Sequence, residues 1–459
     1  MSRPFSTVLV ANRGEIAVRV ISALRDLGLR AVAVYSDADR LSRHVEIADE
    51  AVHIGPPSPA LSYLNIEALI DAARRTGADA VHPGYGFLSE SPRFVEACEG
   101  AGLVFIGPTA ENMRLAGSKL GARGMLEAAG VPVIPGSKRP LLEPDEAREV
   151  ADAIGYPLML KASAGGGGRG MRIVDRPETL DAEFPMARAE ARAAFGDPTL
   201  YLERLIVGAR HIEVQVLGDG RGGAVHLGER NCSIQRRHQK LLEEAPSPCL
   251  TPAAAAQLHD AACRAVETLR YRNAGTVEFL VDADDRCYFM EINARIQVEH
   301  PVTEEVTGVD LIKAQVSIAQ TGELPFAQRD IRPTGHAIEC RINAEDPDAG
   351  FLPQPGTVEQ LRIPGGFGVR FDTFLYAGAV VPIYYDSLIG KLIVRGATRE
   401  AAMATMVRAL GDLQAAPLAT TAPFLKRVIE AEAFRRGDYT LAFLNELLPP
   451  DEDDAGDDE

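Results

Sequence analysis

The first 117 residues alternate between short apolar runs and amphipathic segments. An apolar run at residues 6–11 predicts a buried strand, and the next segment places Ile16, Val20 and Leu24 on one face of a helix. Later strands are predicted at residues 31–35, 78–82 and 103–107, and helices at 66–75 and 94–100. Such alternation is typical of a parallel, doubly wound sheet, so we expect an α/β domain over residues 1–117.

Two α+β units are predicted after this domain. The second unit, residues 118–334, has a helix at 118–129, β-rich segments at 157–174 and 199–229, a long helix at 252–270 and paired strands at 275–282 and 287–294. The third unit, residues 335–447, has strands at 336–344 and 388–396 and a helix at 399–413 with Thr398 as N-cap.

Composition and charge exclude several classes of function. The 459 residues are 46% hydrophobic, enough for two or three domains, and the formal net charge is −17. An acidic surface repels nucleic-acid phosphate, so we expect no nucleic-acid role. No apolar run reaches the ~18 residues that a membrane span needs, and the N-terminus lacks the features of a signal peptide, so we expect a cytoplasmic protein.

Cysteines and the acidic end of the chain carry no predicted chemistry. The six cysteines form no Cys-x-x-Cys pair, which favours reduced thiols over a zinc site. The segment 448–459 has seven acidic residues among its last nine, and we expect a solvated, disordered tail without a catalytic role.

Four consecutive glycines, residues 165–168, lie between two strand-like segments. Glycines can fold closely over a phosphate and present their N–H groups to it. Lys161 precedes them on a strand, from which it could reach the same phosphates. The segment is not a P-loop, because no Gly-Lys-Ser/Thr begins a helix here. A flexible hairpin tip is the alternative interpretation.

The paired strands at 275–282 and 287–294 concentrate acidic residues. A four-residue turn would pair Asp282 with Cys287 and set Glu278 opposite Glu291, with Phe289 and Asn293 on the face of Glu291. Opposed carboxylates are unfavourable unless a cation neutralises them. Together with the Asn293 carbonyl they suit Mg²⁺ shared with ATP phosphates. The alternative is an exposed acidic face on an edge hairpin.

Arg295, Gln297 and Glu299 alternate directly after this hairpin. In an extended segment they would point the same way and offer an anion clamp, a donor and acceptor, and a base, which suits bicarbonate. A solvated polar strand is the alternative. Two other signals are weaker alone: the basic run at 236–240, which could be surface decoration, and Arg341 on an apolar strand, which could be a structural ion pair.

These motifs together closely resemble the biotin carboxylase family of the ATP-grasp superfamily. The matching stretches are residues 11–17 (ANRGEIA), 82–90 (HPGYGFLSE), 161–170, 235–240 (QRRHQK), 295–300 (RIQVEH), 339–346 (ECRINAED) and 385–391 (YDSLIGK). They occur in family order over about residues 5–445. The resemblance implies a Rossmann-like N-terminal domain, an ATP-grasp domain with a mobile glycine-rich lid within a subdomain of about residues 133–206, and a biotin carboxylase C-terminal domain.

The resemblance also implies a role for each matching residue. The ATP-binding set is Lys119, Lys161, Gly166, Gly167, Gly168, Glu203, Arg204, Leu205, His211, Gln235, His238 and Leu280. The Mg²⁺ ligands, for which Mn²⁺ is an alternative ion, are Glu278, Glu291 and Asn293. The bicarbonate and biotin set is Tyr85, Lys240, Arg295, Gln297, Val298, Glu299 and Arg341, and the catalytic members are Lys240, Arg295, Glu299 and Arg341. Three positions depart from common family wording: Ala164, Asn231 and Ala294.

The family chemistry assigns Glu299 as the base that deprotonates bicarbonate before it attacks the γ-phosphate of ATP. Carboxyphosphate then yields CO₂ and phosphate, and Arg341 stabilises the biotin anion that captures CO₂. We expect the biotin carrier and the carboxyltransferase on separate chains, a homodimer, and an acceptor such as acetyl-CoA, another acyl-CoA, pyruvate or urea. Two alternatives are another ATP-grasp carboxylate–amine ligase and a nucleotide-binding regulator without turnover.

Overall fold

The computed structural model describes residues 4–163 and 170–448. The predicted lid glycines Gly166, Gly167 and Gly168 and the acidic residues 449–459 lie outside the described residues. In the described part, no helix combines the length and the apolar character that crossing a bilayer requires.

The N-terminal unit is the predicted parallel sheet, with strand order β3-β2-β1-β4-β5. Its strands are β1 (Thr7–Val10), β2 (Arg30–Ser36), β3 (Glu50–Gly55), β4 (Ala80–His82) and β5 (Val104–Phe105). Its helices are α1 (Gly14–Asp26), α2 (Arg43–Ile47), α3 (Ile66–Thr76), α4 (Pro92–Gly100) and α5 (Ala110–Gly117). The strand order reverses beside β1, and ligands bind α/β sheets at the carboxyl ends of strands at such a point.

The loops after β1 and β4 are fastened together at this point. The Asn12 amide donates to the carbonyls of Pro83 and Tyr85, at 2.7 Å each. Gly84 has φ +62°, and a Cβ there would lie 2.9 Å from the Asn12 Nδ2, so only glycine fits this approach. The contact fixes the start of α1 beside Tyr85.

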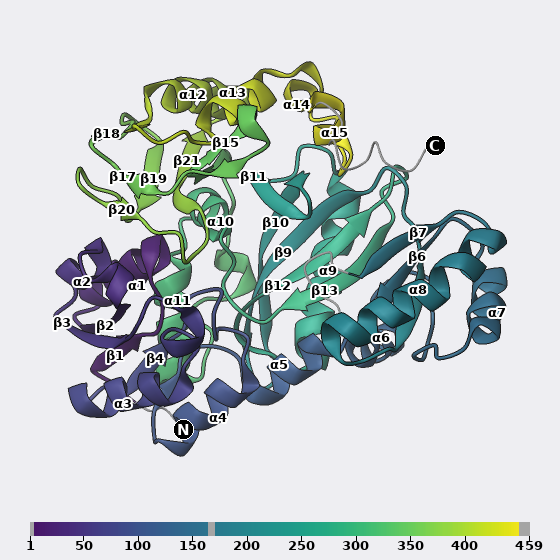
Figure 1. The fold of residues 1–459 in the computed structure, drawn as a ribbon, viewed down its shortest axis with the longest axis horizontal. Coiled ribbons are helices and arrows are strands. Elements are labelled where there is room, and N and C mark those ends of the chain that lie inside the picture. The colour runs from purple at the N-terminus through teal and green to yellow at the C-terminus, as the bar shows by residue number, and fades with distance from the viewer. Residues whose placement is uncertain (1–3, 164–169, 449–459) are drawn as a thin grey trace.

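A smaller three-stranded antiparallel sheet, ordered β7-β6-β8, carries Lys161 and Glu203. Its strands are β6 (Leu158–Ala162), β7 (Met171–Val174) and β8 (Leu200–Arg204). The helices α7 (Pro144–Ile154) and α8 (Pro177–Phe195) pack with it, and α6 (Lys119–Ala128) leads into it. Figure 1 shows this unit at the right, on the far side of the molecule from the purple N-terminal sheet.

An eight-stranded antiparallel sheet joins the rest of the chain, with order β13-β12-β9-β10-β11-β14-β21-β19. Its strands are β9 (Arg210–Asp219), β10 (Ala224–Arg236), β11 (Gln239–Ala245), β12 (Arg272–Val281), β13 (Cys287–Asn293), β14 (His336–Asn343), β19 (Val369–Thr373) and β21 (Leu388–Gly396). Pairing of β11 with β14, as in Leu242 with Cys340, makes the sheet continuous across residue 334. The strands that bear Lys240 and Arg341 are therefore neighbours.

Helices and short strands complete the structure around this sheet. The helices are α9 (Pro252–Thr268), α10 (His300–Thr307), α11 (Leu311–Thr321), α12 (Arg399–Asp412), α13 (Ala422–Glu430), α14 (Glu432–Arg436) and α15 (Phe443–Leu447). The short strands are β15 (Glu345–Asp346), β16 (Leu352–Pro353), β17 (Gly356–Thr357), β18 (Gln360–Arg362), β20 (Val380–Val381) and β22 (Gln414–Ala416). The Thr398 hydroxyl accepts from the Ala401 amide, as predicted for the N-cap of α12.

In the acidic hairpin, the predicted strand pairing is wrong next to the turn and confirmed for the two glutamates. Val281, not Asp282, pairs with Cys287, and an irregularity between Glu278 and Phe279 inserts one extra residue on β13. Glu278 therefore lies opposite Glu291, as predicted. Phe289 pairs with Phe279, with ring centroids 6.3 Å apart, and is not on the face of Glu291. A bulge of this kind cannot be located from alternation alone.

Glu244 on β11 links the eight-stranded sheet to the helices that cover it. It is fully buried, and it accepts bonds from His336 at 2.6 Å, from Arg399 at 2.7 and 2.9 Å, and from Tyr439. Removal of one partner from a buried ion pair leaves an uncompensated charge and costs ~3–5 kcal/mol. Glu244→Ala should lower the thermal unfolding midpoint by several degrees. The exposed control Glu400→Ala should change it little, and equal midpoints for the two variants would contradict this role.

Candidate active site

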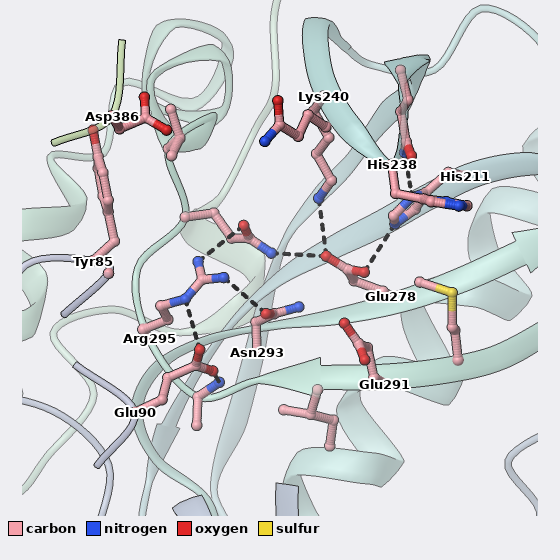
Figure 2. Close-up of a pocket in the computed structure, with 18 of the residues that line it drawn as sticks. Tyr85, Glu90, His211, His238, Lys240, Glu278, Glu291, Asn293, Arg295 and Asp386 are labelled. Carbon is pink, nitrogen blue, oxygen red and sulfur yellow. Dashed lines mark hydrogen bonds and ion pairs between the residues drawn. The ribbon is translucent and has the colours of Figure 1, made fainter. Parts of the chain in front are cut away.

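A cavity of about 1760 Å³ lies where the three units meet. The N-terminal unit contributes Tyr85 to its wall, the small sheet contributes Lys161, and the eight-stranded sheet contributes Lys240, Glu278 and Arg341. Figure 2 shows Lys240, Glu278 and Arg295 grouped in the middle of this wall, with Tyr85 to one side and His211 to the other. Most of the residues singled out from the sequence therefore line one cavity.

Lys240 is surrounded by three carboxylates. Its Nζ lies 2.6 Å from Glu213 Oε2, 2.9 Å from Glu278 Oε1 and 2.7 Å from Glu299 Oε1. Burial lowers the pKa of this ammonium, but the three negative charges outweigh burial and raise the pKa well above its usual value. Lys240 is therefore a permanent cation in the cavity wall.

Glu299 is fully buried and has a cation at each carboxylate oxygen. Lys240 binds Oε1, and Arg341 Nη2 donates to Oε2 at 2.9 Å. Burial raises the pKa of Glu299, but Lys240, Arg341 and Arg230 outweigh burial and hold the pKa well below its usual range. The carboxylate is ionised at neutral pH, as a proton acceptor must be.

Arg341 is both an ion-pair partner and a cavity residue. Its Nε and Nη2 lie 2.7 and 2.6 Å from Glu243 Oε1, and Nη2 also reaches Glu299. Burial lowers its pKa, but Glu243 and Glu299 raise the pKa above its usual value. The guanidinium lines the cavity despite these pairs. The predicted ion pair is confirmed, and a catalytic role for Arg341 stays a prediction.

The segment with Arg295, Gln297 and Glu299 is not the extended strand that alternation predicts. The strand β13 ends at Asn293, a bend follows, and Glu299 sits in a turn as the N-cap of α10. The side chains still converge, because Arg295 Nη1 donates to Gln297 Oε1 at 3.1 Å and Gln297 Nε2 donates to Glu278 at 2.9 Å. Val298 also lines the cavity, and its carbonyl accepts a bond from Lys391 Nζ at 2.9 Å.

Arg295 is a second cation at the acidic hairpin, in addition to Lys240. Its Nε donates to Glu90 Oε2 and its Nη2 to Asn293 Oδ1, both at 3.0 Å. Figure 2 shows its guanidinium between Glu90 and Asn293, on the side of Glu278 that faces Tyr85. An anion bound beside Lys240 would therefore meet a second cation here.

The acidic hairpin has a donor set that fits Mg²⁺. Glu278, opposite Glu291, is buried, and although burial raises its pKa, Lys240 and His211 hold the pKa well below the usual range. Two carboxylates and the Asn293 carbonyl are the hard oxygen ligands that Mg²⁺ takes with substrate phosphates. His211, Glu213 and Glu278 also bring ligand atoms within 4.8 Å of one another, but the Lys240 ammonium already bridges Glu213 and Glu278.

Six of the twelve predicted nucleotide residues line the cavity: Lys161, Glu203, His211, Gln235, His238 and Leu280. Lys161 Nζ binds Glu203 Oε2 at 2.6 Å, and His211 Nδ1 lies 2.7 Å from the Gln235 amide. The backbone of Lys119 begins α6.

Arg204 and Leu205 do not line the cavity. The exposed Arg204 side chain donates to the Ile154 carbonyl at 2.6 Å, and the Leu205 amide donates to the Pro157 carbonyl at 3.0 Å. Both contacts fasten the segment after β8 to the small sheet and its helix. The structure does not bring their side chains to the other nucleotide residues.

Several site residues were missed from the sequence. Glu213 and Glu243 bind Lys240 and Arg341, Glu90 binds Arg295, and Arg123 lies 3.3 Å from Glu203. A signal for Glu213 did exist: His211, Glu213 and Gln215 alternate within an otherwise apolar strand, which is unusual for buried residues unless they have partners.

Comparisons with protein families cover nearly all of the chain. Residues 4–113 match the family described as biotin carboxylase, N-terminal domain, and residues 339–446 match the biotin carboxylase C-terminal domain. Residues 119–327 match the ATP-binding domain of the carbamoyl-phosphate synthase L chain. The chain belongs to the biotin carboxylase family. The expected family and fold class are thereby confirmed.

Curated biotin carboxylase relatives match over nearly their full length. Biotin carboxylase from Nostoc sp. is 50% identical over 443 residues, which are 96% of this chain and 99% of that one. A pyruvate carboxylase subunit from Methanothermobacter thermautotrophicus is 51% identical over 442 residues, 96% of this chain and 90% of that one.

Solved biotin carboxylase structures share the fold. The Campylobacter jejuni enzyme, described as a β,γ-ATP complex, has a TM-score of 0.93 and 45% identity, covering 96% of this chain and 99% of that one. The biotin carboxylase domain dimer of the Hydrogenobacter thermophilus 2-oxoglutarate carboxylase, described with MgADP, ADP and bicarbonate, has a TM-score of 0.91 and 48% identity, covering 97% and 98%.

The fit of the acidic hairpin to a divalent cation can be tested without turnover. Glu291→Gln removes one anionic ligand, so Mn²⁺ binding in the presence of ADP should weaken about tenfold, as titrated by electron paramagnetic resonance. The control Asp282→Asn alters an acid of the same hairpin that pairs with Arg286 at the turn, and it should bind Mn²⁺ normally. Equal Mn²⁺ affinity in both variants would remove Glu291 from the ligand set.

Proposed function

We propose that this chain uses ATP and bicarbonate to carboxylate biotin. The observation that carries the proposal is Glu299, a fully buried, ionised carboxylate held between Lys240 and Arg341, two cations that line the cavity together with Arg295. Cations gathered around one basic group suit a small anion that must lose a proton. Support comes from solved relatives described as binding an ATP analogue, MgADP or bicarbonate.

The first half of the reaction uses the middle of the cavity. Bicarbonate would be held by Lys240, Arg295 and Gln297, and Glu299 would accept its proton. The resulting oxygen would attack the γ-phosphate of ATP and release ADP, leaving carboxyphosphate. Mg²⁺ held by Glu278, Glu291 and Asn293 would neutralise phosphate charge.

The low pKa of Glu299 is consistent with this role once substrate charge is counted. In the free protein, Lys240 and Arg341 both hold Glu299 in its ionised form. A bicarbonate anion would share these cations and weaken their hold, and the anion's own charge would repel the carboxylate. Both effects raise the pKa of Glu299 toward the range in which a base works well.

The second half of the reaction needs Arg341 and the Tyr85 side of the cavity. Carboxyphosphate would decompose to CO₂ and phosphate, and the phosphate would take the proton from the biotin ureido nitrogen. Arg341 would stabilise the ureido anion while that nitrogen attacks CO₂. Exclusion of water would protect carboxyphosphate from hydrolysis.

We propose biotin on a separate carrier chain as the physiological substrate, a carboxyltransferase on another chain, and a homodimer. The Nostoc relative, which is named biotin carboxylase, is matched by this chain over 99% of its own length. Other relatives are named for pyruvate and for 2-oxoglutarate, so the family serves more than one acceptor. For this chain we propose the first half-reaction of an acetyl-CoA or other acyl-CoA carboxylase.

Two substitutions should separate the two halves of the reaction. Glu299→Gln removes the base before ATP is cleaved, so bicarbonate-dependent ADP release and carboxybiotin formation should fall together, by about 10²–10⁴-fold. Arg341→Ala should retain a measurable part of the bicarbonate-dependent ADP release and lose nearly all carboxybiotin. Both products are measured in one reaction, with radiolabelled bicarbonate and free biotin.

The thermal unfolding midpoint of each variant is the control for misfolding. If folded Glu299→Gln still cleaves ATP in response to bicarbonate, the base is another residue. If folded Arg341→Ala loses both activities in proportion, Arg341 acts in the first step.

A further inference from the structure

A second cavity, of about 720 Å³, lies behind the wall of the active site. Its lining includes Arg19, Arg43, Glu304, Asp310, Arg370 and Asp372. Among the described residues, Glu15 alone lines both cavities. Glu15 therefore forms part of the partition between them.

Glu15 is the second residue of α1 and is only 4% exposed. The Tyr85 hydroxyl donates to its Oε1, and Lys391 Nζ lies 3.2 Å from the same oxygen. Oε2 is buried and makes no hydrogen bond to a described residue. Burial raises the pKa of Glu15 to about 7 even though Lys391 opposes this shift. A buried carboxyl so incompletely paired is costly, which favours a role beyond stability.

Lys391 extends this contact to the base. It is fully buried, and its Nζ also donates to the carbonyl of Val298, the residue before Glu299. Its ammonium lies 5.7 Å from the centre of the Tyr85 ring. Tyr85, Glu15, Lys391 and Val298 thus form one line of contacts, in which Glu15 and Lys391 are buried.

Tyr85 needs such an anchor. The Asn12 amide holds the Tyr85 carbonyl, which sets the backbone between Gly84 and Gly86, but the direction of the ring still depends on its side-chain rotamer. Figure 2 shows Tyr85 beside Asp386, on the side of the cavity away from His211 and the nucleotide residues. The hydroxyl contact with Glu15 fixes where the ring faces the cavity.

We propose that Glu15 is a positioning residue for the biotin half of the reaction: it holds the Tyr85 ring against the bound biotin and takes no part in ATP cleavage. This role rests on the proposed function. A change at Glu15 should affect biotin binding and not ATP cleavage, because Lys391 also bonds the Val298 carbonyl. That bond holds the turn that carries Glu299 without the help of Glu15.

The test asks whether the length or the charge of the side chain at position 15 matters for biotin binding. Glu15→Asp keeps a negative charge but shortens the side chain, and Tyr85→Phe keeps the ring but removes the hydroxyl. Each should raise the KM for free biotin about tenfold, and in Glu15→Asp the bicarbonate-dependent ADP release without biotin should stay within about twofold of wild type. The double variant should be no worse than either single variant, because both break one contact.

Glu15→Gln keeps the length and an acceptor oxygen, so its KM for biotin should stay within about threefold of wild type. Asp372→Asn is the matched control, a half-buried acid of the second cavity that pairs with Arg370, and it should leave the KM for biotin unchanged. If Glu15→Gln does not fold, Glu15→Asp and Tyr85→Phe still decide the matter.

Three results would overturn the role of Glu15. One is a wild-type KM for biotin in Glu15→Asp. The second is parallel loss of ADP release and carboxybiotin, and the third is a double variant whose effects multiply to about a hundredfold. Wild-type enzyme without bicarbonate-dependent ADP release would instead overturn the proposed function, and the role of Glu15 with it.

Discussion

The buried ammonium of Lys240 is the point on which the active site depends. It binds Glu213 on β9, Glu278 on β12 and Glu299 before α10, while itself lying on β11. Taking these charges out of water is costly, and only close pairing offsets that cost. The contacts therefore fix the relative positions of a metal-ligand candidate and the proposed base. Loss of Lys240 would remove the cation that these three buried carboxylates share.

A second set of ion pairs extends this constraint through the sheet. Arg230, which is fully buried, binds Glu213 at 2.6 Å, and Arg341 joins Glu243 to Glu299. Acidic and basic side chains alternate along this set of contacts, so neighbouring acids bind the same cation. A substrate anion that enters this array changes the pKa of Glu299 directly, because it competes for the same cations. Binding and activation are thereby linked.

The sequence predicts elements and motif residues well, and contacts between distant strands poorly. Alternating apolar runs predict the parallel sheet, and the family motifs bring Lys240, Glu278 and Glu299 together at one site. The turn register at Val281 was wrong because a bulge is not visible in a period of two. Glu213 was missed because the alternation of polar residues on its strand does not reveal the partner, Lys240, which lies on another strand.

In the proposed function, ATP cleavage is coupled to the carboxylation of biotin. The ratio of ADP to carboxybiotin formed by the wild-type enzyme tests this coupling most directly. ADP and radiolabelled carboxybiotin would be measured together, with bicarbonate and free biotin each supplied or withheld. We expect that ADP release requires bicarbonate, rises when biotin is added, and is then accompanied by carboxybiotin. ADP release that ignores bicarbonate, or that proceeds with biotin present and yields no carboxybiotin, would contradict this expectation.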